Sequence, residues 1–423
     1  MTAQVMLGDV LVGYLDPTGD VVTFVFDAAY LADPDRPVLG QAFEDRVLSP
    51  DQPFTGSPVT PLPTFFRNAL PEGALRKVVE AHLHRSRLIE LNMLLRLGSD
   101  LPGALRVIAD PLAPGADVGE TDVPEPALPP RAADPADPIR FSLSGVQLKA
   151  SVLVDLDDQN KITLPLIGQG GRWIAKFASP MFRDLPENEL TMLRWARATG
   201  LNVPDHRIVD AASIQNLPTE FSPDGRALLI ARFDRSASQG RIHQEDFAQV
   251  FDIEPEEKDA LFLPHFRPPL AVTYAGIGST VRALAGEDDY KEFVRRVAFM
   301  ILSGNADAHA KNWSLFYPDG VHARLSPLYD VVSTVAYPSV HHTLPLGFVV
   351  PEDPARMTRI EMEAITYRDV RELAEQADEP ADAIESDVRD FVARARTAWK
   401  EVRGDAPSFV AAAIDRHLER VAL

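Results

Sequence analysis

The chain contains no cysteine among its 423 residues, which excludes disulfide bonds, thiolate nucleophiles and thiolate metal ligands. It also lacks an apolar run long enough to span a membrane, and its first residues lack the basic segment of a secretory signal. No repeat with a period of about 20 to 50 residues is present, which excludes a solenoid. We therefore expect a cytoplasmic protein without membrane contact.

Basic side chains are also scarce. Lys and Arg number 42 and Asp and Glu number 62, which gives a net charge of −20. An excess of negative charge repels the phosphates of nucleic acids, so we expect no direct contact of this chain with DNA. The length is enough for two or three domains with a large core.

Residues 1–108 are predicted to form an independent unit of strands and helices. Two strand-like runs, Val10–Leu15 and Val21–Phe26, flank the turn signal Asp16–Gly19 and predict a hairpin. The helical half of this unit includes an amphipathic stretch over Ala74–Leu94.

A segment rich in proline, alanine and acidic residues separates this unit from the rest. Its composition cannot bury enough apolar surface to fold, so we interpret residues 109–138 as a linker. Residues 139–235 then combine strand-like runs with one helix, whereas residues 236–423 are mostly helical. We expect these two parts to form a smaller and a larger lobe.

Apolar residues at helical spacing predict the core of the larger lobe. The helix expected over Asp289–Leu302 carries one such set, and the helical tail from Glu352 carries another. The expected core residues are Phe293, Val297, Met300, Ile301, Val388, Phe391 and Val392.

Three polar residues in the stretch Asn305–Asp330 stand at a spacing typical of phosphotransferases. Asn312 lies five residues after Asp307, and Asp330 lies twenty-three residues after Asp307. Such a set supplies one carboxylate to orient a hydroxyl nucleophile, and an amide and a second carboxylate to hold Mg²⁺ against the phosphates of ATP. His309 stands between the first two.

A hairpin is predicted between these polar residues. Trp313–Tyr317 is typical of a strand, Pro318–Gly320 is a turn signal, and Ala323–Leu325 can return antiparallel. This arrangement would bring Asn312 and Asp330 to the same end. Asp and Asn are also common in turns, but the preceding apolar helix and the intervening histidine favour an active site.

A strand and a helix in the smaller lobe carry a candidate ion pair. The strand Trp173–Phe177 places its aromatic residues on one face and Lys176 on the other. Lys176 can then reach ATP phosphates, although a surface lysine with a packed stem is the usual alternative. Glu189 lies on a helix expected to start near Pro186 and to end at Gly200. It can point inward and pair with Lys176, or it can simply complement the helix dipole.

Two further segments are candidates for nucleotide contacts. The run Arg140–Ala150 breaks at Gly145, where a turn can direct backbone N–H groups at phosphate oxygens, although an ordinary bulge has the same sequence. The apolar strand that begins at Ala227 leads into Ala231–Phe233, whose backbone can face adenine. The same residues also fit a buried strand capped by a salt-bridged Arg-Phe-Asp-Arg.

Seven motifs, taken in order, resemble the signatures of the HipA toxins, which are serine/threonine protein kinases of type II toxin–antitoxin modules. The segments Phe65–Gly73 and Leu97–Ala104 also resemble the N-terminal subdomain of that family. The motifs are Ser142–Gly145 with Gln147 and Lys149, Ile174–Lys176, Asn188–Glu189, Ala231–Arg235, His243–Asp246, Asp307–Asn312 and Leu328–Asp330.

The resemblance implies an α+β, two-lobed protein-kinase-like fold with an N-terminal α/β subdomain and a helical C-terminal lobe. It implies that Asp307 and His309 are catalytic and that Asn312 and Asp330 also hold Mg²⁺. It further implies an ATP site, of which Lys176 is the phosphate-binding lysine. The other ATP-binding residues implied are Ser144, Gly145, Val146, Gln147, Lys149, Glu189, Ala231, Phe233 and Lys311.

The resemblance also implies partners and control. The expected substrate is a protein, in known members often an aminoacyl-tRNA synthetase, whose phosphorylation stalls translation. A small helix-turn-helix antitoxin, HipB, would supply the DNA contact that this acidic chain lacks. The regulatory autophosphorylation site falls on Ser142, but Ser144 stands where many relatives have a small residue other than serine, so both remain candidates.

Two alternatives from other classes stay open at this point. An aminoglycoside-type phosphotransferase shares the spacing of Asp, His and Asn, although the N-terminal segments and the loop around Gly145 argue against it. A non-catalytic regulator that binds an antitoxin without turnover is the second alternative.

Overall fold

The computed structural model forms two compact units, and it describes most of the chain. Unit 1 comprises residues 1–178, 209–255 and 316–321, and unit 2 comprises residues 179–208, 256–315 and 322–423. The described residues are 2–46, 48–49, 51–72, 76, 79–80, 83, 88–98, 100–110, 149–155, 161–163, 170–179, 181–217, 225–236, 240–263, 270–338, 340, 342–351 and 357–423.

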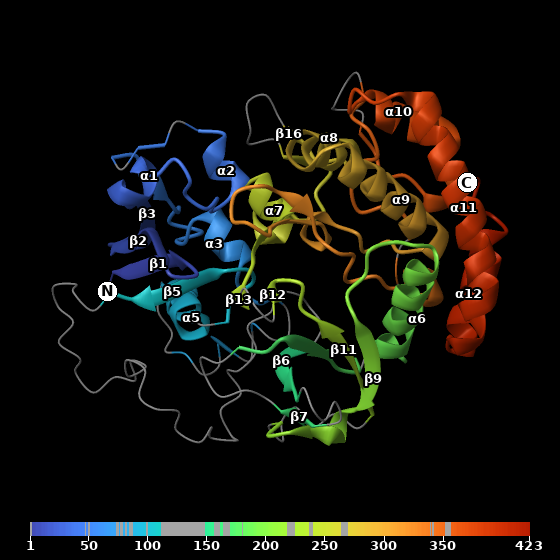
Figure 1. Cartoon of the computed structure of the whole chain (residues 1–423), viewed down its shortest axis with the longest axis horizontal. Coiled ribbons are helices and arrows are strands. Elements are labelled where there is room, and N and C mark those ends of the chain that lie inside the picture. The colour runs from blue at the N-terminus through green and yellow to red at the C-terminus, as the bar shows by residue number, and fades with distance from the viewer. Residues whose placement is uncertain are drawn as a thin grey trace. The chain divides into compact units, whose positions relative to one another are not determined.

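An antiparallel five-stranded sheet opens unit 1 (Figure 1). Its strands, in spatial order, are β4 (Phe54–Thr55), β3 (Val21–Phe26), β2 (Val10–Thr18), β1 (Ala3–Leu7) and β5 (Leu105–Ala109). Burial alternates along β1 and β3, because every second side chain faces the core. The predicted hairpin is confirmed, but its turn is wrong: β2 pairs with β3 up to Thr18, and the loop is Gly19-Asp20, where Gly19 has φ +63°.

A second sheet in unit 1 contains the strands that carry the candidate lysines. Its unit 1 strands run in the order β10 (Ile214–Gln215), β7 (Ile162–Thr163), β6 (Lys149–Val154), β8 (Trp173–Lys176) and β11 (Arg226–Ala231). β8 pairs antiparallel with both β6 and β11. One face of these three strands joins the hydrophobic core through small and branched residues, among them Ala150, Val152, Ala175 and Leu229.

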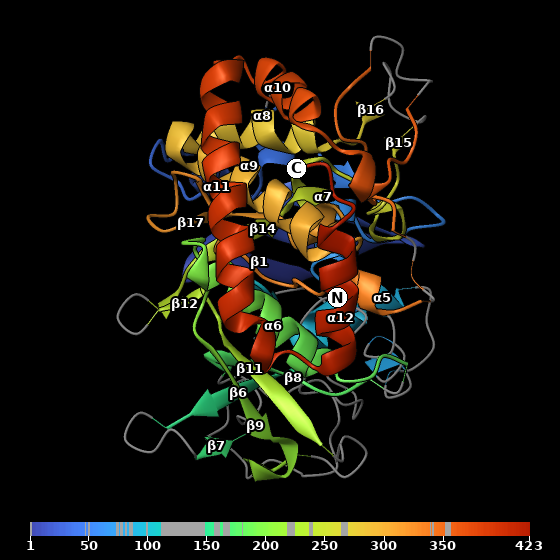
Figure 2. The ribbon, with the colours of Figure 1, turned by 90° about the vertical axis from the view of Figure 1, so that its right-hand side faces the viewer.

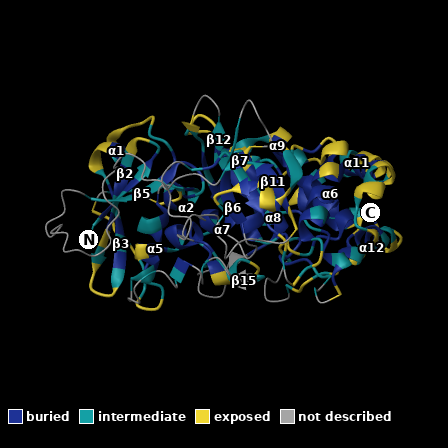
Figure 3. Ribbon diagram, turned by 90° about the horizontal axis from the view of Figure 1, so that it is seen from below, coloured by how far each residue is buried: buried dark blue, intermediate teal, exposed yellow. Residues whose placement is uncertain are grey.

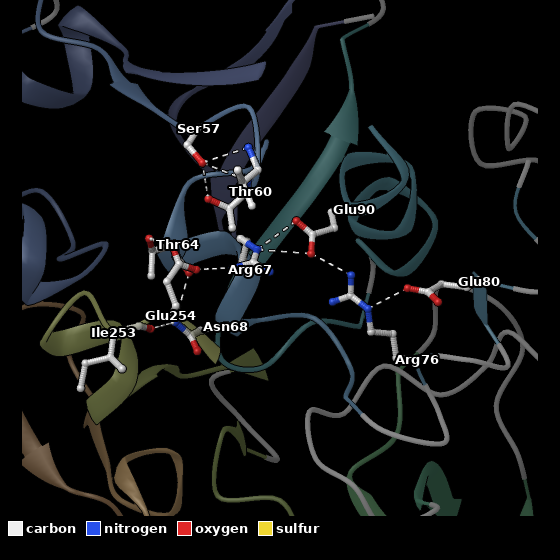
Figure 4. Close-up of polar contacts among 11 residues, drawn as sticks. Ser57, Thr60, Thr64, Arg67, Asn68, Arg76, Glu80, Glu90, Ile253 and Glu254 are labelled. Carbon is white, nitrogen blue, oxygen red and sulfur yellow. Dashed lines mark hydrogen bonds and ion pairs between the residues drawn. The ribbon is translucent and has the colours of Figure 1, made fainter. Parts of the chain in front are cut away.

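A buried ion network ties the helical part of residues 1–108 to the segment after α7 (Phe247–Val250), as Figure 4 shows. Arg67 on α3 (Thr64–Asn68) bridges Glu90 at 3.0 Å and also bonds Glu254. The neighbouring Asn68 donates to the carbonyl of Ile253 at 2.8 Å. The Arg67–Glu90 pair is buried, whereas Glu254 is 28% exposed, so α3 is held on that segment by a partly buried ion pair and by the buried bond of Asn68.

Unit 2 is mainly a helical bundle (Figure 2). α11 (Ala381–Val402) packs against α6 (Leu185–Ala198), α9 (Glu287–Ser303) and α10 (Tyr367–Glu375), and α9 also packs against α8 (Tyr274–Ala285) and α12 (Ser408–Leu418). Figure 3 shows α6 largely buried, whereas α11 and α12 expose residues on their outer sides. All seven core residues predicted for this part are buried.

No helix in the described ranges is both long and apolar enough to cross a membrane. The predicted helix over 74–94 lies largely outside the described residues, and the helix that is described there, α5 (Ile89–Leu97), packs on β5. The remaining elements are α1 (Ala28–Ala32), α2 (Gln41–Glu44), β9 (His206–Asp210), η1 (Ala211–Ser213), β12 (Arg235–Ser236), β13 (Gly240–Arg241), β14 (His243–Asp246), η3 (Pro255–Glu257), β15 (Phe262–Leu263), β16 (Leu270–Ala271), η4 (Ala310–Asn312), β17 (Ser314–Tyr317), β18 (Arg324–Leu325), η5 (Thr334–Ala336), η7 (Met362–Ala364) and η8 (Arg403–Asp405).

The end of α9 depends on a glycine, which gives a testable prediction. Gly304 has φ +66°, and a Cβ there would lie 2.4 Å from Val335. Gly304→Ala should therefore combine left-handed strain with overpacking and cost about 3 kcal/mol of stability in chemical denaturation. Gly200→Ala is the matched control, because Gly200 has φ +91° but open space around it, and it should cost about 1 kcal/mol. Equal losses would contradict the packing argument.

Candidate active site

The loop after α9 holds Asp307 on a fixed backbone. The side-chain oxygen of Asn305 accepts the N–H of Asp307 at 3.0 Å. The next carbonyl, that of Ala308, accepts from the hydroxyl of Tyr274 at 3.0 Å and from the indole N–H of Trp313 at 3.3 Å. Both aromatic side chains are buried, whereas Asp307 is exposed. The loop therefore presents a carboxylate to solvent from an ordered support.

Asn312 is bonded to the same loop. Its Nδ2 donates to the carbonyl of Asp307 at 2.7 Å, and the residue is buried at the end of η4. This bond uses the amide nitrogen of Asn312. The amide oxygen, Oδ1, is the atom that a hard cation such as Mg²⁺ requires.

The chain returns from the predicted hairpin so that Asp330 runs beside this loop. Ser326 N–H donates to the carbonyl of Ser314 at 3.0 Å, and the hydroxyl of Tyr329 donates to the carbonyl of Lys311 at 2.9 Å. Past Asp330, the hydroxyl of Thr334 accepts from Ala306 N–H at 2.8 Å and donates to the carbonyl of Gly304 at 2.9 Å. Asp330 thus lies between two points at which its segment is bonded to residues 304–314.

The backbone of Asp330 adopts a positive φ. It has φ +52°, in the left-handed region that few residues other than glycine adopt. Asp184, Asn216, Asp252 and Asp378 share this conformation, which Asp and Asn adopt more readily than most residues, so the backbone angle alone does not distinguish Asp330.

α6 also holds the segment after Asp330, a contact that the sequence did not signal. Asn188 is fully buried, and its amide pairs with the backbone of Ser333 through two bonds: Nδ2 donates to the carbonyl at 3.0 Å and Oδ1 accepts the N–H at 2.9 Å. Glu189, the next residue, is buried on the same helix with Leu193 and Ala196, as the predicted inward face requires. Its pairing with Lys176 stays a prediction, because the two residues belong to different units.

Two lysines stand opposite each other in the second sheet of unit 1. Lys149 on β6 and Lys176 on β8 are direct register partners, so their side chains leave the sheet on the same face. Both are buried, at 7% and 3% exposure, which rules out the alternative of an exposed surface lysine. Like charges directly opposite each other are destabilising, so this position favours an anionic group nearby. The sequence predicted both lysines as ATP-binding residues, but it did not indicate that they are register partners.

The segment after β11 has the salt-bridged structure that the sequence offered as an alternative to adenine binding. Arg232 bonds Asp234 at 2.7 Å and Asp100 at 2.8 Å, and Arg235 bonds the same two carboxylates. The two arginines hold the pKa of Asp234 well below its usual range despite burial. The side chain of Phe233 takes no part in these salt bridges. It contacts Phe316 edge to face, with the ring centroids 6.1 Å apart.

A third polar cluster in unit 1 surrounds the tip of the hairpin, residues 316–321. The hydroxyl of Tyr317 donates to the buried carboxylate of Glu245 and accepts from Nε2 of Gln41 at 3.1 Å. Glu245 also accepts the backbone N–H of Gln41 at 3.1 Å, and the N–H of Val38 donates to the carbonyl of Gly320 at 2.8 Å. Residues 38–41 therefore bond the tip at several points.

Several predicted site residues lie outside the described residues. They are Ser142, Ser144, Gly145, Val146 and Gln147, together with the linker beyond Asp110. Within the described ranges, no group of three or more His, Asp and Glu side chains is arranged to hold a metal ion. A site of two protein oxygens, completed by phosphates and water, is what the sequence predicted and what Mg²⁺ commonly uses.

Comparison with known proteins defines first the class and then the family. The structure resembles that of the Shewanella oneidensis MR-1 HipA, HipB and operator DNA complex, with a TM-score of 0.70 at 21% identity over 99% of this chain and 96% of that chain. The fold is therefore the predicted α+β, two-lobed kinase-like fold. The model of the HipA N-terminal domain matches residues 3–108, and that of the HipA-like C-terminal domain matches residues 141–399. The chain belongs to the HipA family.

Curated relatives carry kinase names. "Putative kinase Y4dM" of Sinorhizobium fredii is 35% identical over 408 residues, which cover 95% of this chain and 92% of that protein. "Serine/threonine-protein kinase toxin HipA" of Shewanella oneidensis is 24% identical over 380 residues, which cover 84% of this chain and 80% of that protein.

The cluster around Glu245 predicts a pH-dependent stability. Burial, with smaller contributions from the carboxylates of Asp246 and Glu44, raises the pKa of Glu245 from 4.5 to about 8, although the bonds from Tyr317 and Gln41 lower it. Between these values the unfolded chain loses this proton while the folded chain keeps it, so stability falls as pH rises, by up to about 1.4 kcal/mol per pH unit. Glu245→Gln removes this dependence. Its stability relative to the parent protein should increase from pH 4.5 to 8 in chemical denaturation, and a constant difference would contradict the prediction.

Proposed function

We propose that this chain is an ATP-dependent serine/threonine protein kinase that transfers the γ-phosphate to a hydroxyl group of a protein. The observation that carries the proposal is the return of residues 326–334 along residues 304–314, which brackets Asp330 beside the loop of Asp307 and Asn312. Membership of the HipA family supports a protein substrate over the aminoglycoside-type alternative.

The contacts of Asp307, Asn312 and Asp330 suggest functions for these residues. Asp307, exposed on a fixed backbone, orients the acceptor hydroxyl and takes its proton. His309 lies on the same loop, and Asn312 and Asp330 offer hard oxygens suited to Mg²⁺. When bound, Mg²⁺ would neutralise charge on the ATP phosphates.

The proposed ATP site also draws on residues of unit 1 and on α6. Lys149 and Lys176 place two positive charges on one face of the sheet, where phosphates would offset their repulsion. Backbone groups at Ala231 and Phe233 are assigned to adenine. Supporting positions are assigned to Glu189 and Lys311, and the loop over the phosphates is assigned to Ser144, Gly145, Val146 and Gln147.

The proposed partner is a HipB-like helix-turn-helix antitoxin, through which alone the chain would meet DNA. Two observations support this: the similar solved structure contains HipB and operator DNA, and this chain has a net charge of −20. A protein target such as an aminoacyl-tRNA synthetase would connect phosphorylation in the cytoplasm to inhibition of translation and growth.

Self-modification tests the reaction without knowledge of the substrate. With ATP and Mg²⁺, the protein should acquire phosphoserine at Ser142 or Ser144, and Asp307→Asn should acquire none, because an amide cannot take the hydroxyl proton. Mass spectrometry measures both, and the phosphorylated protein should lose ATP affinity, since phosphate adds about 1.5 to 2 negative charges. Equal phosphorylation of Asp307→Asn would refute the assignment of Asp307, and ATP binding without any turnover would favour the non-catalytic regulator.

ATP affinity measured with and without Mg²⁺ distinguishes a proposed metal ligand, Asp330, from a proposed phosphate-binding lysine, Lys176. Asp330→Ala should weaken ATP binding by about tenfold in Mg²⁺ and leave it unchanged in EDTA, because it removes only a metal ligand. Lys176→Met should weaken binding under both conditions, since its charge acts on the phosphates directly. Calorimetry measures all four affinities, and Asp330→Ala binding as tightly as the parent protein in Mg²⁺ would leave Asp330 as a turn residue only.

A further inference from the structure

The hairpin that joins Asn312 to Asp330 is held at its tip by residues of the N-terminal subdomain. Tyr317 is the central contact: its ring stacks on His243 with the centroids 5.8 Å apart, and its hydroxyl bonds both Gln41 and Glu245. All four side chains belong to unit 1, and Tyr317, Glu245 and His243 are buried.

Residues 36–41, the segment of the N-terminal subdomain that contacts the tip, are held in turn by hydrogen bonds and an ion pair. The hydroxyl of Tyr30 donates to the carbonyl of Pro37 at 2.5 Å. Arg36 forms a two-bond ion pair with Glu44 at 2.6 and 2.7 Å. The Arg36–Glu44 pair brackets Val38 and Gln41 in the sequence, and the bond from Tyr30 holds Pro37 just before them, so the tip is held by an ordered part of the chain.

Only short segments connect this tip to Asn312 and Asp330, the two proposed oxygen ligands. Five residues lead from Asn312 to Tyr317, and nine residues lead from Val321 to Asp330, with a strand on each side. β17 covers four of the five residues that lead from Asn312 to Tyr317, and it is paired on one side with β14 and on the other with β18. Movement at the tip would therefore change the spacing of Asn312 and Asp330.

We infer that Tyr317 is a positioning residue, through which residues 36–41 of the N-terminal subdomain set the geometry of the Asn312 and Asp330 pair. The inference rests on the proposed function, in which this pair holds Mg²⁺ against ATP. A macromolecule that binds the N-terminal subdomain and displaces residues 36–41 would then alter metal-dependent nucleotide binding without a contact to either ligand.

Two conservative substitutions in the full chain test this inference. Tyr317→Phe removes only the hydroxyl at the tip, whereas Tyr290→Phe removes a buried hydroxyl that donates to the carbonyl of Leu373 on α10 at 3.2 Å, and neither of these two residues belongs to the hairpin. The readouts are ATP affinity in Mg²⁺ and in EDTA, and amide hydrogen exchange over residues 305–312 and 327–334.

Tyr317→Phe should weaken ATP binding by about fivefold in Mg²⁺ and leave it unchanged in EDTA, which is the size expected for one lost hydrogen bond. It should also speed exchange in both segments, and Tyr290→Phe should do neither. Gln41→Ala should reproduce the effect, and the double substitution with Tyr317→Phe should add little, because both remove the same contact.

The two proposals fail in different ways. Unchanged exchange in both segments of Tyr317→Phe would overturn the positioning role, whatever the nucleotide affinities. Metal-independent ATP binding by the parent protein would overturn the assignment of Asn312 and Asp330 in the proposed function. Faster exchange in Tyr317→Phe would in that case still support the mechanical link from the tip to the two segments.

Discussion

Hydrogen bonds between residues 304–314 and residues 326–334 are the interaction on which the candidate site depends. They are made by backbone groups and by the hydroxyls of Tyr329 and Thr334, and they hold two segments in which regular structure is limited to short elements such as η4, a single turn. An isolated loop would pay the entropy of ordering each residue, of order 1–2 kcal/mol. Here that cost is offset by a buried helix on one side and by a hairpin in between.

Satisfied polar groups account for much of this order. Asn188 sits in a fully buried position that only a group with both a donor and an acceptor can fill against the backbone of Ser333. The cluster of Arg232, Asp234 and Arg235 works in the same way in unit 1. Such networks contribute little net stability, but each member is costly to lose because its partner is then buried without compensation. They therefore select one arrangement of loops over others.

The sequence predicted the features that a local pattern determines, such as helix ends. It did not predict the contacts between segments that are distant in the chain. The boundaries of α6 and α9 follow from Pro186 at the start of one helix and from Gly200 and Gly304 just beyond the two ends, signals that lie within a few residues. The turn after β2 lies later than predicted, because Asp16 and Pro17 fit a turn signal as well as the end of a strand that pairs there with β3 alone. The register of Lys149 with Lys176 and the bond of Asn188 to Ser333 join segments far apart in the chain, which no local periodicity records.

The proposed function requires an acidic protein to bind a nucleotide that is itself strongly anionic. At physiological ionic strength a surface charge is screened over about 8 Å, so most of the net charge of −20 acts weakly on a ligand that lies farther away than this. Lys149 and Lys176 are buried, where salt screens a charge much less than it does at the surface. Two such lysines on one face can therefore favour a small polyphosphate. A long nucleic acid, in contrast, would meet mainly a surface with a net negative charge, which agrees with the proposed function, in which this chain binds a nucleotide and a partner binds DNA.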